Sequence, residues 1–560
     1  MKKKEETMAR KRNQKESFMQ GVFILMLSQI LVKVLGVIYK LYLTNREGFG
    51  DKGNAIYSSG FQIYALFLTI SSIGVPNAIS KLVSEKVAIN DHKGAHRIFK
   101  IALITFGTLG FLCSCILFLG AGTIAQSFLQ IPEAELTLVA LSPSIFFVAI
   151  SCVIKGYFNG RENIKVTANS QTLEQLFKMV LSIILVEFIS MVSGSDTTIM
   201  AAGANLATTL ATFLCFGYLY RYYKDMRKEI AWEIKNTVNH KPTRIRKTLK
   251  QILSVSIPMS MSGILGTINK NVDSMTVVRG LKKFLTEEEA KIQYGILSGK
   301  VDTLVTLPMS FNMAFATALV PAISSAKAIG DVSTIHKRIS FSLLITILIG
   351  LPFMVGMILF AQPILELLFP NATSGSFIYQ MSCLSIIFIV LEQTICGALY
   401  GLGKIMTPAF ALGIGVIIKL ILNLLLIPID PTNFILGGTA GAAFATMICH
   451  MIAVNIEYNV LKNKIQLKLN FKKFILKPVL ATVIMGIISF ITYHYLVFII
   501  SPKLTTIISL IVATIVYLIV LILLRIFSKE EIFMIPYGKK IYYFLERLRL
   551  YGKRRMSLKY

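Results

Sequence analysis

Long apolar segments recur along the whole of this 560-residue sequence, for example at 98–125, 343–361 and 507–524. A run of about 20 apolar residues is long enough to cross a bilayer as a helix. Lipid offers no hydrogen-bond partners, so a spanning backbone must satisfy its own polar groups within helices. The sequence therefore predicts an all-α integral membrane protein with about 14 transmembrane helices. The predicted spans are 18–43, 55–80, 98–125, 134–154, 170–192, 198–220, 252–278, 295–326, 339–361, 375–402, 406–427, 437–460, 478–500 and 504–524.

The positive charge is distributed unevenly between the two sides of these spans. The chain has 58 Lys and Arg against 29 Asp and Glu, and its net charge is +29. With the N-terminus inside, most basic residues fall in the tails and in the inner loops, of which 221–250 is the most basic. The other side holds only Arg46, Lys52, Arg279, Lys282, Lys283, Lys291 and Lys503. This bias follows the positive-inside rule and predicts that both termini are cytoplasmic.

The composition also excludes whole classes of protein. Because 54% of the residues are hydrophobic and only 16% are charged, the chain is neither an ordinary soluble protein nor a disordered one. We expect a multi-pass protein of the plasma membrane whose basic tails and 221–250 loop contact anionic lipids. On this topology the charge excess gives no reason to expect a nucleic-acid partner.

The two halves of the chain resemble each other. Four pairs of segments match in the same order, on corresponding spans: Gly74–Ser80 with Val320–Ser324, Tyr157–Arg161 with Tyr400–Lys404, Lys178 with Lys419, and Gly203–Thr208 with Gly441–Thr446. Six spans separate the copies, so both copies have the same orientation in the membrane, as in a parallel repeat. The predicted segments are a cytoplasmic basic tail (1–17), a six-helix N-lobe (18–221), a cytoplasmic basic loop (222–250), a six-helix C-lobe (251–461), two extra helices (462–526) and a cytoplasmic basic tail (527–560).

Two pseudo-symmetric lobes are typical of a transporter that works by alternating access, with its substrate between the lobes. The sequence has no Walker motif, no HExxH and no Cys/His spacing of a metal site. We therefore expect neither an enzyme nor a metal or other cofactor. The membrane potential or a monovalent cation is then the available driving force.

Lys33 and Lys40 are the strongest candidates for a substrate site. Ionisable side chains at membrane depth cost about 2.5–3.5 kcal/mol each on insertion scales, so they usually face a cavity or a partner. The two lysines are seven residues apart on one helix face, and the predicted span contains no acid. This pattern favours a site for an anion such as a phosphate. The alternative is that the lysines extend toward the membrane surfaces, which is plausible for Lys40 at the outer end of the span.

Further candidates are charged residues on other spans. Lys270 and Asp273 are three residues apart and can pair, and so can Glu174 and Lys178, which are four apart. Lys300 enters its span from the outer side, and Lys419 has no acid in its span. The alternative for each is a structural ion pair or an interfacial position. Four prolines within spans are hinge candidates, with static bends as the alternative: Pro76, Pro258, Pro308 and Pro321.

Several motifs are similar to those of a known family. Lys33-Val-Leu-Gly-Val-Ile-Tyr-Lys40, Gly74-Val-Pro-Asn-Ala-Ile-Ser-Lys81, Lys155-Gly-Tyr-Phe-Asn-Gly-Arg161 and Leu319-Val-Pro-Ala-Ile-Ser324 resemble the polysaccharide-biosynthesis branch of the MOP exporter superfamily. They resemble most closely its Gram-positive SpoVB/YtgP group, which is related to the MurJ lipid II flippases and takes part in cell-wall biogenesis and sporulation. The resemblance implies two six-helix lobes in a V around a cationic cavity. It also places Lys33 where the Gram-negative flippases have an arginine.

The resemblance implies a flippase that moves an undecaprenyl-pyrophosphate-linked sugar from the inner to the outer leaflet by alternating access. Lipid II, the peptidoglycan precursor, is the favoured cargo, and cell-wall synthesis enzymes are candidate partners. One alternative is a flippase for another lipid-linked polysaccharide. A second is a cation-coupled multidrug exporter of the same superfamily, and a third is a scaffold that does not transport. The two lysines of the first span argue against the exporter, which needs a deep acidic residue in the N-lobe.

Overall fold

The computed structural model describes residues 28, 31–72, 74–161, 163–235, 244–328, 330–467, 469–534 and 538–547. These residues form helices joined by short loops, with no strand among them. Residues 31–45 are helical. The other elements are α2 (Gly50–Ser72), α3 (Val75–Ala88), α4 (His92–Thr123), η1 (Ile124–Leu129), α5 (Ala134–Gly160), α6 (Ile164–Ser193), α7 (Thr197–Asp225), α8 (Arg227–Lys235), α9 (Ile245–Leu281), α10 (Glu287–Gly295), η2 (Ile296–Val301), α11 (Asp302–Ala328), α12 (Val332–Leu359), α13 (Ala361–Leu368), α14 (Ser376–Cys383), α15 (Ile386–Gly401), α16 (Met406–Leu426), α17 (Gly438–Ile465), η3 (Lys472–Leu476), α18 (Lys477–Leu496), α19 (Pro502–Leu523), α20 (Lys529–Met534) and α21 (Gly538–Arg547).

The prediction of an all-α membrane protein is confirmed. Within the described residues, 11 helices are long and apolar enough to cross a membrane. Three further helices coincide with predicted spans: the helix 31–45, α9 and α11. The last two carry many polar side chains, which is why their hydropathy is lower. Residues 18–27, 29 and 30 of the predicted span 18–43, the tail 1–17 and the residues 236–243 and 548–560 lie outside the described part of the chain.

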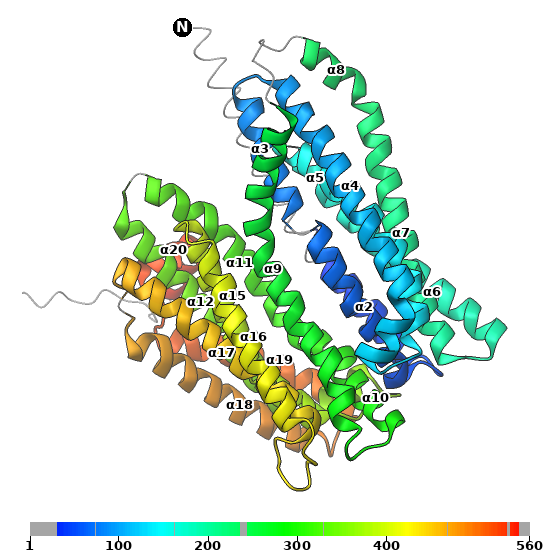
Figure 1. Cartoon of the computed structure of the whole chain (residues 1–560). Helices are drawn as coiled ribbons and strands as arrows, with labels where there is room; N and C mark the ends of the chain where they lie inside the picture. Colours follow the sequence, from blue (N-terminus) through cyan, green and yellow to red (C-terminus); the bar gives the residue numbers. More distant parts are fainter. Residues whose placement is uncertain are drawn as a thin grey trace, which may run out of the picture.

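The helices form two bundles that meet at one end (Figure 1). The N-lobe consists of the helix 31–45 and α2 to α7, and the C-lobe contains α11 to α17, with α18 packed on α12 and on α19. Helix α9 lies between the lobes and contacts both α2 and α16. The bundles diverge toward the end that carries α8 and α20, which we call the open end, and meet near α10, which we call the closed end.

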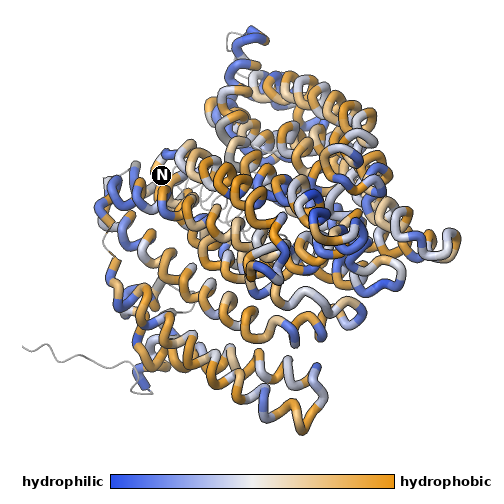
Figure 2. The backbone as a smooth tube through the Cα atoms, turned by 60° about the horizontal axis from the view of Figure 1, so that its bottom comes forward, coloured by the Kyte–Doolittle hydropathy of each residue, from blue (hydrophilic) through white to orange (hydrophobic). Residues whose placement is uncertain are grey.

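The polarity of the helices agrees with a membrane environment. Apolar residues dominate the middle of the long helices, and polar residues gather at their ends (Figure 2). Many large apolar side chains are exposed on the outer helices, for example Leu119, Phe188 and Ile487. Such a surface is stable only if lipid covers it, because soluble proteins rarely expose large apolar patches.

The sequence repeat has a counterpart in how helices cross within each lobe. A Cβ atom at Gly156 or Gly160 of α5 would lie 2.8 or 2.7 Å from the carbonyl oxygen of Pro76 or Ser80 of α3. In the C-lobe, a Cβ atom at Gly397 or Gly401 of α15 would lie 2.5 or 2.9 Å from a carbonyl oxygen of α11. Each crossing therefore depends on a pair of glycines four residues apart that lets two backbones touch. Both crossings involve segments that match in the repeat.

The predicted hinge prolines lie in two kinds of position. Pro76 lies in the first turn of α3, two residues after Gly74, whose φ of 80° marks the break between α2 and α3. Proline is tolerated there because the first turn of a helix has free N–H groups anyway. Pro258 lies within α9, and Pro308 and Pro321 lie within α11, where the helices continue through them. The role of all four as hinges stays a prediction.

We predict that Gly160→Leu and Gly401→Leu each destabilise the protein. A larger side chain must push two contacting backbones apart, and overpacking of this kind costs about 1–3 kcal/mol. Thermal unfolding of the purified protein in detergent should show a lower Tm for both variants. Gly356→Leu is the matched control, because a Cβ atom at Gly356 meets nothing within 4 Å. Equal losses in the control and in the two variants would contradict a specific role for the crossings.

Candidate functional site

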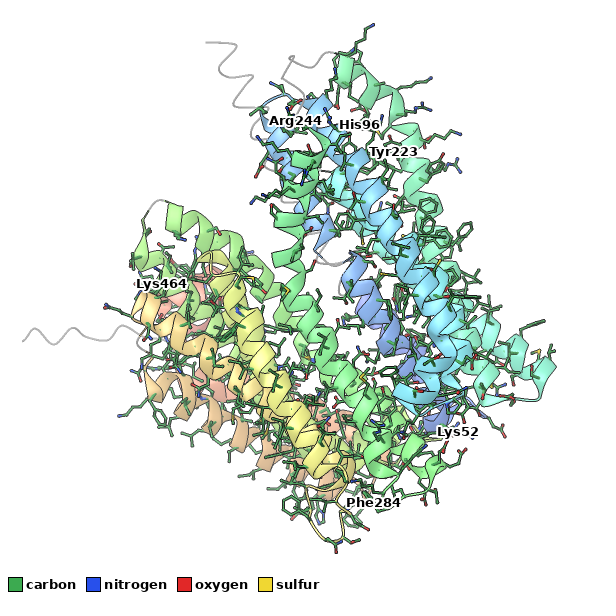
Figure 3. The ribbon with its side chains drawn as sticks, viewed as in Figure 1. Lys52, His96, Tyr223, Arg244, Phe284 and Lys464 are labelled. Carbon is green, nitrogen blue, oxygen red and sulfur yellow. The ribbon has the colours of Figure 1, made fainter. Side chains whose placement is uncertain are left out.

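A large cavity lies between the two lobes. Its volume is about 1260 Å³, and its walls come from the helix 31–45, α2, α6, α9, α11 and α15 to α17. Cavities for small molecules usually have about 300–1,000 Å³, so this one admits a larger ligand. Figure 3 labels residues at the two ends of the molecule: Lys52 and Phe284 mark the closed end, and Arg244, His96 and Lys464 mark the open end.

Six of the eight candidate residues line this cavity: Lys33, Lys40, Lys178, Lys270, Asp273 and Lys419. They come from both lobes and from α9 between them, so the fold brings together residues up to 386 positions apart in the sequence. Glu174 and Lys300 are not among the lining residues. The participation of each residue in substrate binding stays a prediction.

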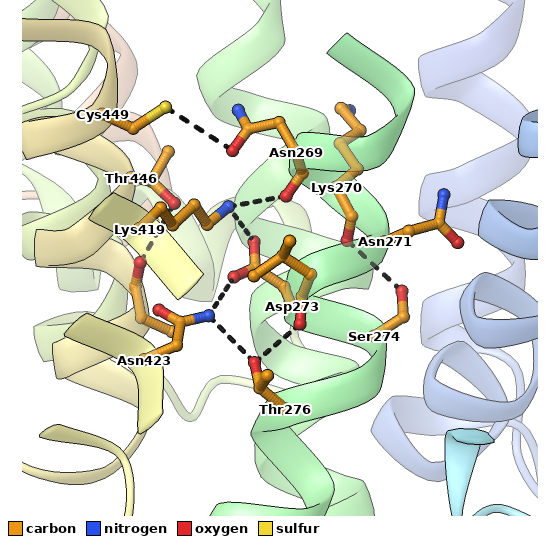
Figure 4. A network of polar contacts seen from close by, with 12 residues as sticks. Asn269, Lys270, Asn271, Asp273, Ser274, Thr276, Lys419, Asn423, Thr446 and Cys449 are labelled. Carbon is orange, nitrogen blue, oxygen red and sulfur yellow. Dashed lines mark hydrogen bonds and ion pairs between the residues drawn. The ribbon is translucent and has the colours of Figure 1, made fainter. Parts of the chain in front are cut away.

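The expected pair between Lys270 and Asp273 is wrong. Lys270 Nζ instead lies 2.8 Å from Asp302 Oδ2 at the start of α11. Asp273 turns toward α16, where its Oδ2 lies 2.7 Å from Lys419 Nζ and its Oδ1 accepts a hydrogen bond from Asn423 (Figure 4). Neighbouring helices bring a partner of opposite charge to each residue, so the pairing within α9 is not needed.

Lys419 is therefore a neutralised cation. Its side chain is only 1% exposed, and its Nζ also donates to the carbonyl oxygen of Asn269, at 2.9 Å. Breaking a buried pair of this kind costs about 3–5 kcal/mol, because it leaves one charge without compensation. This group ties α16 to α9 and leaves little positive charge for a ligand.

The expected pair between Glu174 and Lys178 is also wrong. Glu174 lies 3.4 Å from Lys155 of α5. Lys178 Nζ lies over the rings of Phe61 and Tyr39, at 4.5 and 5.3 Å from their centroids. An aromatic ring attracts an ammonium group through its quadrupole but supplies no counter-charge.

Lys40 is in the same situation. Its side chain is 6% exposed, its Nζ lies 4.5 Å from the centroid of the Tyr57 ring, and it makes no hydrogen bond to any described residue. Lys33 also lines the cavity and lies seven residues, or about two helical turns, before Lys40 on the same helix. Within the described part of the chain, Lys33, Lys40 and Lys178 form no ion pair with a carboxylate. We call these three residues the lysine cluster.

The lysine cluster differs from the other cavity lysines in its environment. It lies on the N-lobe wall, where the described lining residues include no acid. An ammonium group without a counter-ion in a low-dielectric cavity strongly attracts an anion, and an ionised hydrogen bond is roughly twice as strong as a neutral one. The arrangement therefore suits a multiply charged anion such as a phosphate ester.

The closed end is held by contacts between the lobes that the sequence did not predict. Lys300 is fully buried; its Nζ lies 2.9 Å from Asp51 of α2 and also donates to the carbonyl oxygens of Ala372 and Ser374. Lys291 of α10 lies 2.6 Å from Glu133, which precedes α5. We call Asp51, Glu133, Lys291 and Lys300 the closed-end clamp. Lys300 lies just before α11, near the start of its predicted span, and the expectation that this end faces outward stays a prediction.

At the rim of the clamp, Glu287 pairs with Lys291, with 2.9 Å between Oε1 and Nζ. Hydrogen bonds from Lys282 and Lys291 lower the pKa of Glu287 to about 2. A lowered pKa means that the contribution of Glu287 is present above the usual glutamate range and is lost only as the pH falls toward 2. The sequence contained one signal for the clamp: Asp51 and Glu133 lie within four residues of the predicted starts of the spans 55–80 and 134–154, on the side with few basic residues.

We predict that Lys300→Met opens the closed end. The substitution leaves Asp51 as an uncompensated buried charge, at a cost of about 3–5 kcal/mol. Hydrogen exchange followed by mass spectrometry should show faster exchange in the peptides that cover 287–301 and 370–376. Lys52→Met is the control, because Lys52 and Glu288 also link α2 to α10 but are 39% and 56% exposed. An exposed pair contributes about 0–1 kcal/mol, so equal effects of the two variants would contradict the clamp.

Comparison with known proteins identifies related chains. A family profile described as "Polysaccharide biosynthesis protein" matches residues 18–327, and one described as "Lipid II flippase MurJ" matches residues 300–508. "Stage V sporulation protein B" of Bacillus subtilis (strain 168) is 26% identical over 530 residues, which cover 93% of this chain and 98% of that protein. The family resemblance expected from the motifs is thereby confirmed.

Two solved structures share the fold. The structure "Lipid II flippase MurJ, inward closed conformation" has a TM-score of 0.64 at 17% identity and covers 89% of this chain and 98% of its own. An inward-facing MATE family multidrug resistance transporter of the MOP superfamily has a TM-score of 0.62 at 14% identity, with coverage of 80% and 98%. At these identities the likeness concerns the fold alone.

Proposed function

The chain belongs to the polysaccharide biosynthesis protein family, and from this premise we propose that it is a flippase for an undecaprenyl-pyrophosphate-linked sugar, with lipid II as the favoured cargo. The second matching family profile and both solved structures are named as flippases or transporters, and none of these names describes an enzyme. The observation that carries the proposal is the lysine cluster, which leaves three cations of the N-lobe wall without a carboxylate partner.

A pyrophosphate diester is the ligand whose chemistry fits these residues. It carries about two negative charges, and ammonium groups bind phosphate oxygens by short charge-assisted hydrogen bonds. Lys40 and Lys178 lie within electrostatic range of each other, so an anion between them relieves their mutual repulsion. A neutral or cationic cargo gains nothing from this wall.

The opposite wall suits the sugar. Ser382, Ser385, Gln393 and Thr446 of the C-lobe line the same cavity and offer hydroxyl and amide groups. Sugars are recognised by such groups, which both donate and accept hydrogen bonds. We propose that the pyrophosphate binds the N-lobe wall while the sugar faces the C-lobe.

The direction of transport follows from the charge distribution. If the basic tails lie in the cytoplasm, the open end faces the inner leaflet and the structure is the state that accepts cargo from that side. Opening of the closed-end clamp then releases the cargo outward. A membrane potential of about 100 mV, negative inside, contributes about 2.3 kcal/mol per charge to the inward return of an empty cationic site.

Because the fold is also that of a MATE transporter, a multidrug exporter is the second candidate function. The acids of the N-lobe argue against it. Glu174 is paired with Lys155. Glu187 is paired with Arg46 and accepts a hydrogen bond from Tyr42. Neither carboxylate lines the cavity, so neither is free to bind a cationic drug.

We predict that Lys33→Ala, Lys40→Ala and Lys178→Ala each weaken the binding of lipid II to the protein in nanodiscs. A hydrogen bond to a charged group contributes about 1.5–3 kcal/mol, so each loss should weaken binding roughly 10- to 100-fold. Microscale thermophoresis with a fluorescent lipid II measures the change. Lys337→Ala is the control, because Lys337 is exposed and pairs with Glu530 far from the cavity.

The choice of cargo is tested by competition. An unlabelled undecaprenyl-pyrophosphate without sugar should displace the labelled lipid II, though more weakly, while undecaprenol and a cationic dye should not. If only the dye displaced the labelled lipid II, the result would contradict the flippase and favour a multidrug exporter. Equal displacement by carriers with unrelated glycans would assign the protein to another lipid-linked polysaccharide.

A further inference from the structure

A second group of ionisable residues lies in the C-lobe wall, away from the lysine cluster. It consists of Glu392 and Cys396 on α15 and of His450 and Glu457 on α17. A ligand atom of each of Glu392, Cys396 and Glu457 lies within 4.8 Å of those of the other two. The sequence did not indicate this group, because its members come from two helices and no charged residue lies within six positions of His450.

These residues are linked by hydrogen bonds. His450 Nδ1 lies 2.5 Å from Glu392 Oε2, and Cys396 Sγ donates to Glu457 Oε1 at 3.3 Å. Glu457 is completely buried, and its second oxygen, Oε2, has no hydrogen-bond partner among the described residues. A buried carboxylate oxygen without a donor is costly when it is ionised.

Positive charges do not compensate the two glutamates. Lys419 of α16, a helix that packs on α17, is already paired with Asp273 of α9. The thiols of Cys396 and Cys449 are the other titratable groups beside the glutamates. The charged groups of α11 and α12, which pack on α15, are bonded elsewhere: Asp302 to Lys270, Lys327 to the carbonyl oxygen of Leu402, Lys337 to Glu530 and Arg338 to the carbonyl oxygen of Ala322. The remaining titratable groups of α11, α12 and α14 are His336, Tyr379 and Cys383. Helix α9, which packs on α17, also carries Arg246, Lys247, Lys250 and Arg279, which are exposed near its two ends.

Two adjacent carboxylates in an apolar interior do not both stay ionised, so the group must hold a cation or a proton. A proton fits best. Na⁺ needs several oxygen ligands, whereas this group offers two carboxylates, an imidazole and a thiol. Zn²⁺ suits that donor set, but His450 Nδ1 and Glu392 Oε2 are bonded to each other and do not point at a shared centre.

The position of the group gives the proton a path. Glu392, Cys396 and His450 line the cavity, while Glu457 lies behind them and does not. His450 and Glu457 are seven residues apart and lie on the same face of α17. A proton from cavity water therefore reaches Glu392 or His450 first. Glu457 then takes the proton of the Cys396 thiol, and the thiol takes one from Glu392, so that only O–H, N–H and S–H bonds are exchanged.

The group is also connected to the helix between the lobes. Asn269 of α9 donates from Nδ2 to His450 Nε2 at 3.3 Å, and its carbonyl oxygen accepts from Lys419. Figure 4 shows Asn269 between Lys419 and Cys449. When His450 carries two protons, its Nε2 can no longer accept, so the contact with Asn269 must change. A protonation event in the C-lobe thereby alters the packing of α9 against α17.

We propose that Glu392, His450 and Glu457 form a proton-binding site that is loaded from the cavity and couples proton movement to the change of conformation. The proposal rests on the proposed flippase function for its consequence, but not for the binding of the proton. It assigns the protein a driving ion as well as a cargo.

Infrared difference spectroscopy tests the proton directly, without any cargo. The full-length protein in liposomes is titrated with acid and base. We expect a carbonyl band of a protonated buried carboxylic acid that disappears in Glu457→Gln, with a shift in its titration in Glu392→Gln. Glu366→Gln is the control, because Glu366 accepts a bond from Gln362 at an exposed site. An unchanged band in both cluster variants would overturn the proposal, and either variant suffices if the other does not fold.

Proteoliposomes test the coupling. With fluorescent lipid II as the probe, in sodium-free buffer, we expect an imposed pH gradient to change the flipping rate several-fold in the wild type and in Glu366→Gln. Glu457→Gln should lose this dependence while it still binds the probe. Flipping that responds to Na⁺ and ignores the pH gradient would overturn the proposal, and so would stoichiometric zinc in the purified wild type that is lost in Glu457→Gln.

The two proposals fail in different ways. If the wild type binds and flips the probe but ignores the pH gradient, the coupling site is wrong and the flippase stands. If the wild type neither binds nor flips the probe, the flippase is wrong. The infrared titration then still decides whether the site holds a proton.

Discussion

The cost of charge in a membrane interior governs this structure. Each ionised side chain between the lobes must find a counter-charge, a ligand or a proton, because lipid and apolar side chains solvate none of them. The described residues use all three solutions. Lys270, Lys300 and Lys419 have carboxylates at 2.8, 2.9 and 2.7 Å, the lysine cluster has none, and Glu392 and Glu457 lie together without a cation. The uncompensated groups are therefore the ones that point to function.

The sequence predicted the fold well because the signals for spans are long and redundant. A block such as 507–524 needs no tertiary information, and α19 covers it. The repeat was also accessible, since Tyr157–Arg161 and Tyr400–Lys404 match in sequence, and each segment contains a glycine, Gly160 or Gly401, that packs against the backbone of a neighbouring helix. Spans with a polar stripe, such as α9, were harder to delimit, because they exchange apolar residues for the groups that line the cavity.

The pairing of charges was not predictable to the same degree. Helical spacing allowed Lys270 with Asp273 and Glu174 with Lys178, but spacing only says what two residues on one helix can do. The partners chosen lie 32, 146 and 19 residues apart. Glu457 was missed because it lies near the end of a span where a carboxylate usually reaches water, whereas the packing of α15 buries it completely. Contacts between helices decide these cases, and no local pattern contains them.

The repeat explains why one wall of the cavity is cationic and the other is not. Lys178 and Lys419 occupy corresponding positions in the two halves. In the C-lobe, Asp273 of α9 lies 2.7 Å from Lys419 and neutralises it. In the N-lobe, the rings of Phe61 and Tyr39 face Lys178, and no carboxylate pairs with it among the described residues. The two corresponding lysines therefore have different surroundings, with a carboxylate beside Lys419 and aromatic rings beside Lys178. The C-lobe, with its own cation satisfied, has room for two carboxylates beside it.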